Sequence, residues 1–169
     1  MSAETPSIDQ RHLQRCIALA TEALENGDDP FGSVLVAADG AVLAEAMNRE
    51  ISDADPTAHP EMALVRWAIA HLTPEQRATS TVYTSGEHCP MCAGAHGWAG
   101  LGRIIAAASA AQLAEWRASW GLPAGAVAAM PVTDVAPGVV ILAPVPPFDA
   151  QMREVHRRAA SRALSEGDG

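Results

Sequence analysis

Two short segments of the chain contain residue types that bind metal ions. His59, Pro60 and Glu61 lie in the first segment, and Cys89 and Cys92 form a Cys-x-x-Cys pair in the second. Proteins bind zinc tetrahedrally through imidazole nitrogens and thiolate sulfurs, and catalytic sites keep one of the four positions for water. One His and two Cys supply three ligands, so the pattern predicts a catalytic zinc site formed by His59, Cys89 and Cys92.

Glu61 is the candidate for proton transfer at this site. Zinc lowers the pKa of bound water from about 15.7 to about 7, and a neighbouring group must accept the proton. Residues i and i+2 of a helix point about 200° apart, so His59 and Glu61 converge only if His59 precedes the first helical turn. Pro60 favours that placement because proline fits the first turn of a helix, and Pro90 marks a second helix start beside Cys89.

Two other interpretations of these residues are also open. The Cys pair alone could be a redox-active dithiol. His88 directly precedes Cys89 and could fill the fourth metal position, which would make the site structural and the chain a zinc-stabilised binding module. His88 could instead orient a metal ligand or point at a substrate carbonyl group.

The elements around these segments follow from apolar periodicity and turn residues. Asp39-Gly40 is a strong hairpin signal. Strands that alternate with helices after an opening hairpin predict an α/β fold of the three-layer α/β/α type with a mixed sheet. Helices are expected at about 8–25 (capped by Ser7), 59–72, 90–99, 110–120 and 148–165, strands at 33–38, 41–47, 81–84, 103–108 and 139–142, and a connector at 73–79.

Length and composition restrict the class of protein. The 169 residues are expected to form a single domain (1–169). Its catalytic core is expected at about 8–120, and a C-terminal segment follows at 121–169. Residues 121–138 of that segment are rich in Gly, Pro and Ala. The net charge of −9 argues against a nucleic-acid binder. No apolar run is long enough to span a membrane, and Met1–Thr5 does not resemble a secretory signal. We therefore expect a cytoplasmic protein.

Both segments together resemble the zinc-dependent cytidine deaminase superfamily, whose signature is H-x-E followed by P-C-x-x-C. The resemblance runs from about residue 30 to 108 and is nearest to the guanine deaminase, cytosine deaminase and tRNA adenosine deaminase branch. It implies a central five-stranded sheet with helices on both faces, a bound Zn²⁺ and often a homodimer. The chain departs from the family at Pro60, where Ala or Val is usual, and at His88, where Pro is usual.

The resemblance also implies an activity and site residues. His59, Cys89 and Cys92 would be the zinc ligands and Glu61 the proton shuttle for hydrolytic deamination of a small nucleobase or nucleoside, such as guanine or cytosine, with release of ammonia. The alternative within the family is a tRNA adenosine deaminase, against which the charge of −9 counts.

A flat heterocycle needs an apolar slot and a few directed polar groups. By resemblance, the amide of Asn48 would hold the base, although Asn48 could also be a simple turn residue. Further candidates for substrate contact are Phe31, His88, His96 and Trp98, since His96 follows Cys92 by four residues and shares its helix face. Trp116 and Trp120 are expected to pack together, and His156 is expected at the surface.

Overall fold

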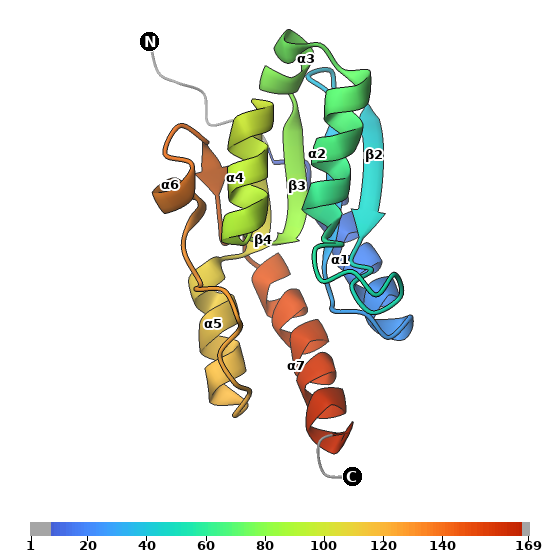
Figure 1. The fold of residues 1–169 in the computed structure, drawn as a ribbon, viewed down its shortest axis with the longest axis vertical. Helices are drawn as coiled ribbons and strands as arrows, with labels where there is room; N and C mark the ends of the chain where they lie inside the picture. Colours follow the sequence, from blue (N-terminus) through green and yellow to red (C-terminus); the bar gives the residue numbers. More distant parts are fainter. Residues whose placement is uncertain (1–7, 167–169) are drawn as a thin grey trace.

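The computed structural model describes residues 8–166 (Figure 1). Figure 1 shows a central sheet with helices on both faces, which confirms the predicted α/β/α architecture. Among the described residues, no helix is both long and apolar enough to cross a membrane. The elements are α1 (Gln10–Glu25), β1 (Gly32–Val36), β2 (Val42–Met47), α2 (Pro60–His71), α3 (Pro74–Ala78), β3 (Thr81–Gly86), α4 (Pro90–Ala99), β4 (Arg103–Ala108), α5 (Ala110–Ser119), α6 (Val132–Val135), β5 (Ile141–Leu142) and α7 (Phe148–Glu166).

The five strands form one mixed sheet in the order β2-β1-β3-β4-β5. β1 pairs antiparallel with β2 and with β3, whereas β3–β4 and β4–β5 are parallel. The predicted hairpin joins β1 to β2, and its Gly40 has a φ of 89°, a conformation that glycine adopts readily. β3 leads into α4 and β4 leads into α5, so both of these helices begin at the same edge of the sheet.

Apolar cores lie on both faces of the sheet. Val34 and Val36 of β1 pack with Leu13 of α1 in one core, while Leu35 packs with Leu64 of α2 in the other. This division follows from the two-residue period of a strand, in which successive side chains point to opposite faces. α1 and α7 therefore cover one face, and α2 and α4 cover the other.

Two short helices were not expected from the sequence. The segment predicted as a connector, 73–79, contains α3, which is held by a capping box between Thr73 and Gln76. The region 121–138 contains α6. Both helices are too short to show apolar periodicity, which explains why the pattern did not indicate them.

The start of α1 also differs from the prediction. The predicted cap, Ser7, lies outside the described residues. Asp9 is the cap, and its Oδ1 accepts a hydrogen bond from the backbone N–H of Arg11. Aspartate satisfies an unpaired N–H of the first turn as serine would.

Candidate metal centre and active site

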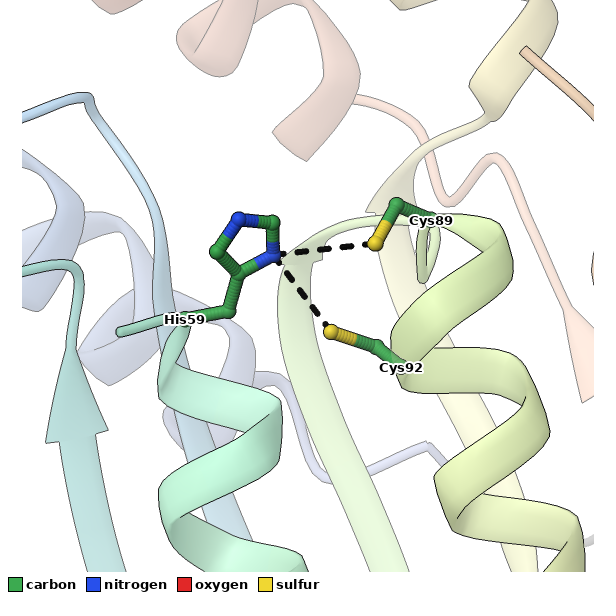
Figure 2. Close-up of side chains that lie close together, drawn as sticks. All are labelled: His59, Cys89 and Cys92. Carbon is green, nitrogen blue, oxygen red and sulfur yellow. Dashed lines mark hydrogen bonds between the residues drawn. The ribbon is translucent and has the colours of Figure 1, made fainter. Parts of the chain in front are cut away.

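Three potential metal ligands converge where α2 and α4 begin. Figure 2 shows the imidazole of His59 facing both thiols, with Nδ1 3.6 Å from Cys89 Sγ and 3.4 Å from Cys92 Sγ. The three ligand atoms lie within 4.8 Å of one another. Tetrahedral zinc ligands at Zn–S of about 2.3 Å and Zn–N of about 2.0–2.1 Å stand roughly 3.6 Å apart. Donor set and spacing therefore fit a zinc ion held by these three residues.

The backbone at the two helix starts places these side chains. His59 is the N-cap residue of α2 (φ −79°, ψ 144°) and Cys89 the N-cap residue of α4 (φ −66°, ψ 167°), both extended. Pro60 and Pro90 occupy the first turns. The predicted helix entrances are confirmed, and the extended backbone of His59 lets its side chain share the site with Glu61.

The surroundings of the thiols favour negative charge. The pKa of Cys89 is lowered to about 4, because its thiolate accepts hydrogen bonds from the Cys92 thiol and from His59. The pKa of the Cys92 thiol is raised, because it donates to Cys89 and is buried. The helix N-termini add a partial positive charge. Cys89 is thus the thiol of the pair that deprotonates more readily.

Glu61 lies buried beside His59, Cys89 and Cys92, the three candidate ligands that we call the metal cluster. Glu61 is only 5% exposed. Its Oε1 lies 3.2 Å from Thr84 Oγ1, and its Oε2 lies 3.8 Å from Cys92 Sγ. Desolvation raises the pKa of Glu61 to about 7. A carboxyl group with that pKa can both accept and donate a proton near neutral pH.

A cavity of about 440 Å³ gives access to this group. His59, Glu61 and Cys89 line it, as do two of the predicted substrate-contact residues, Phe31 and His88. Much of the remaining wall comes from α5 and from segment 122–130, which is irregular and mainly apolar.

Three predicted substrate-contact residues do not line this cavity. Asn48 is 1% exposed, and its side chain bonds to Glu50 instead. His96 shares a face with Cys92 as expected but lies a full turn deeper, and its Nε2 bonds to the carbonyl oxygen of Gly102 at 2.7 Å.

Trp98 requires the clearest correction. It is 94% exposed and borders a separate depression of about 1260 Å³ beside Gly94 and Gly97. Six residues after Cys92 on a helix, a side chain points about 120° away from that of Cys92, which turns Trp98 away from the metal cluster.

His88 does not belong to the ligand cluster. Within residues 8–166 the group of possible metal ligands contains His59, Cys89 and Cys92 without it. His88 is 1% exposed, and its ring lies 5.2 Å from that of His96 in an edge-on arrangement. Neither ring nitrogen has a hydrogen-bond partner among the described residues. Burial lowers the pKa of His88, so the ring is neutral and offers one donor and one acceptor.

The prediction that His156 lies at the surface needs correction. Its Nε2 is buried, and its ring packs edge-on to Phe31 at 5.1 Å and lies 6.1 Å from Trp116. His156 therefore supports Phe31 from α7. The apolar spacing along α7 could have indicated this, since Met152 and Val155 on the same helix are buried.

Sequence reasoning also missed polar residues that support the site. Glu50 contacts His59, and Thr84 contacts Glu61. Glu87 accepts hydrogen bonds from the backbone N–H groups of Ala110 and Val132, both at 2.8 Å. Of these residues, only Glu87 could have been suspected from the sequence, because it lies two residues before the candidate ligand Cys89.

Comparison with known proteins agrees with this geometry. The family model described as the cytidine and deoxycytidylate deaminase zinc-binding region matches residues 6–108. Guanine deaminase from Bacillus subtilis is 41% identical over 104 residues, which are 61% of this chain and 66% of that protein. A solved structure of guanine deaminase from that organism superposes with a TM-score of 0.58 at 39% identity, covering 64% of this chain and 69% of the other.

Two further relatives carry different names. A probable cytosine deaminase from Schizosaccharomyces pombe is 35% identical over 104 residues (62% of each protein). A tRNA-specific adenosine deaminase from Haemophilus influenzae is 33% identical over 101 residues, 60% of this chain and 58% of that protein. The chain thus spans 66%, 62% and 58% of the lengths of these three relatives.

The family match covers more than half of the chain and includes both segments of the metal cluster. The chain belongs to the deaminase family defined by the cytidine and deoxycytidylate deaminase zinc-binding region.

Proposed function

We propose that the protein is a zinc-dependent hydrolase that removes an exocyclic amine from a small nucleobase or nucleoside, such as guanine or cytosine, and releases ammonia. The observation that carries this proposal is the buried carboxyl group of Glu61 beside a three-ligand metal cluster in one cavity. A fourth protein ligand would favour a structural site, but His88 lies outside the cluster.

Each residue of the cluster has a separate task. His59, Cys89 and Cys92 would hold zinc, which acts as a Lewis acid and makes water a better nucleophile. Glu61 would take a proton from that water, whose oxygen attacks the carbon bearing the amine, and pass it to the neighbouring ring nitrogen. It would then take the second proton from the hydroxyl group so added and deliver it to the amine, so that the C–N bond breaks and ammonia leaves. Thr84, 3.2 Å from Oε1, keeps the carboxyl group directed at the site.

The cavity suits a small aromatic heterocycle. Its volume of about 440 Å³ lies within the range of about 300–1,000 Å³ that is usual for small-molecule pockets. Phe31 and Leu113 provide apolar surface, while His88 provides a buried polar edge. The names of the relatives, guanine deaminase and probable cytosine deaminase, support substrates of this kind.

An ammonia-release screen tests the proposal. The purified zinc-loaded protein is incubated with purine and pyrimidine bases, their nucleosides and aminotriazines. We expect release from one or a few free bases or nucleosides, and no release after zinc has been removed with a chelator. Release from none of these compounds would contradict the proposal.

Deamination of tRNA is the alternative within the family, and a tRNA-specific relative supports it. Affinity for RNA comes mainly from cations that neutralise phosphates, whereas this chain has a net charge of −9. Tight, salt-sensitive binding of tRNA in a gel-shift assay would favour the alternative over the small-molecule reading.

We also expect the chain to act as a cytoplasmic homodimer built from one domain per chain. The thiols of Cys16, Cys89 and Cys92 are all free, as a reducing compartment would keep them. Trp98 and Val140, which are 94% and 70% exposed, line the same depression, and an exposed apolar patch favours an interface. Light scattering of the wild type and of Trp98→Ala measures the oligomeric state, and a monomeric wild type would contradict the expectation.

A further inference from the structure

We propose that Glu50 is a positioning residue of the metal centre. Its carboxylate holds the ring of His59 so that Nδ1 faces the two thiols, and it links that ring to Asn48. This inference rests on the metal site of the proposed function, but it does not depend on which base is the substrate.

Three contacts hold Glu50, two at its carboxylate and one at its backbone N–H. Its Oε1 lies 2.9 Å from His59 Nε2 and accepts a hydrogen bond of 2.8 Å from Asn48 Nδ2. The backbone N–H of Glu50 donates a bond of 3.0 Å to Asn48 Oδ1. An ionised carboxylate only accepts, so this contact favours a proton on Nε2 and leaves Nδ1, which faces the two thiols, as the nitrogen that would bind a metal. Glu50 thereby fixes both the tautomer and the orientation of the His59 ring.

The backbone around Glu50 is held as firmly as its side chain. Its carbonyl oxygen accepts a hydrogen bond of 3.0 Å from the N–H of Asp55. Ile51 and Ser52, the next two residues, each donate an N–H bond of 2.8 Å to Oδ1 of Asp28, a residue only 1% exposed. The backbone that carries the Glu50 side chain is therefore fixed in the loop that leads into α2, and the bond from Asn48 holds the carboxylate itself.

The rival interpretation is an ordinary surface ion pair. The side chains of His59 and Glu50 are each 25% exposed, and exposed ion pairs contribute little to stability. An ion pair of that kind would leave metal affinity unchanged. A partner that orients a histidine ligand behaves differently, because its removal lowers metal affinity about 10–100-fold. Metal affinity therefore separates the two interpretations.

The experiment compares zinc affinity in the wild type, Glu50→Ala, Glu50→Gln and Glu45→Ala by competition with a chelator of known affinity. Glu45 is the matched control, since its carboxylate pairs with Arg15 at 2.8 Å and is 33% exposed. We expect Glu50→Ala to bind zinc about 10–100-fold more weakly. Glu50→Gln should lose less, because its amide oxygen can still accept from Nε2, and Glu45→Ala should match the wild type.

Several results would overturn the inference. The inference is wrong if both Glu50 variants bind zinc with wild-type affinity. It is also wrong if Glu45→Ala loses as much zinc affinity as Glu50→Ala, because that would indicate a general effect on stability. The absorption of the cobalt-substituted protein provides a readout of ligand geometry that a purely structural role would leave unchanged, and it should change in Glu50→Ala. Failure of the wild type itself to bind zinc would instead contradict the proposed function.

Asn48→Ala supplies an independent arm. If Asn48 acts through Glu50, its removal weakens zinc binding, and the double variant with Glu50→Ala is no weaker than Glu50→Ala alone. Zinc affinity that stays at the wild-type value in Asn48→Ala would remove Asn48 from the proposed linkage.

Discussion

The two halves of the chain contribute different parts of the site. The region 30–108 supplies the three metal ligands and Glu61, all of them at or within one turn of a helix start. The region 109–166 supplies α5 and segment 122–130, which form much of the cavity wall without any metal ligand. The comparison teaches that the candidate metal ligands and the buried carboxyl group lie in one region, while much of the cavity wall comes from the other.

Glu87 connects the two regions. It lies between β3 and the metal ligand Cys89, and its two carboxylate oxygens accept from the backbone of Ala110, at the start of α5, and of Val132, at the start of α6. The cavity wall is thus fixed by a residue of the region that carries the metal cluster.

The largest effect is expected in the first region, from loss of a metal ligand. Cys92 and Cys16 are both free and fully buried, so Cys92→Ala and Cys16→Ala make a matched pair. Cys92→Ala should lose bound zinc and all measurable ammonia release, whereas Cys16→Ala should keep both. One zinc per chain in Cys92→Ala, measured by elemental analysis, would contradict the assigned ligand set.

A large residue in the second region should affect substrate use without affecting the metal. Ala114 of α5 lines the cavity, and Ala111 on the same helix is exposed and does not. Ala114→Trp should lower kcat/KM about 10–200-fold, the effect expected from altered pocket contacts, and retain full zinc content. Ala111→Trp should behave as the wild type. Equal rates in both variants would remove α5 from the substrate pocket.

A core substitution in α7 tests whether the two regions fold together. Met152 is fully buried against α1 and the sheet, while Leu164 on the same helix is 48% exposed. Met152→Ala should lower the free energy of unfolding by about 2–5 kcal/mol in a single transition. Leu164→Ala should change it by about 0.5 kcal/mol or less. Two separate denaturant transitions would contradict the single-domain expectation.

A further prediction concerns acid stability. Burial lowers the pKa of His156 to about 4, and Arg117 adds to the shift. Between pH 6.5 and pH 4, the unfolded chain therefore binds a proton that the folded chain does not, so the free energy of unfolding falls as the pH falls through this window. A titration of the His156 ring by NMR that gave a midpoint at or above 6.5 would contradict this account.

The fold and the metal cluster were predictable because local signals determine them. Pro60 and Pro90 mark the helix starts, Asp39-Gly40 marks the hairpin, and a β-branched apolar run marks β1. Each signal acts over a few residues, so no knowledge of the tertiary structure is needed. His59, Cys89 and Cys92 could therefore be placed together from type and spacing.

The substrate-contact residues were less predictable, because their positions depend on packing between distant segments. Sequence distance suggested Trp98 near the metal, but the direction of its side chain on α4 places it at the surface. Asn48 and Glu50 bond to each other although they lie only two residues apart in a loop, and such a contact leaves no pattern of apolar residues in the sequence. Segment 122–130 contains neither helix nor strand, so nothing in its composition indicates that it covers the cavity.

Replacement of the buried carboxyl group tests the central claim most directly. Glu61→Gln keeps the size of the side chain and its contact with Thr84 but removes the group that transfers protons. With the best substrate of the screen, we expect one zinc per chain and ammonia release reduced about 10²–10⁴-fold. A zinc-loaded Glu61→Gln variant that releases ammonia at the wild-type rate would contradict the proposed mechanism.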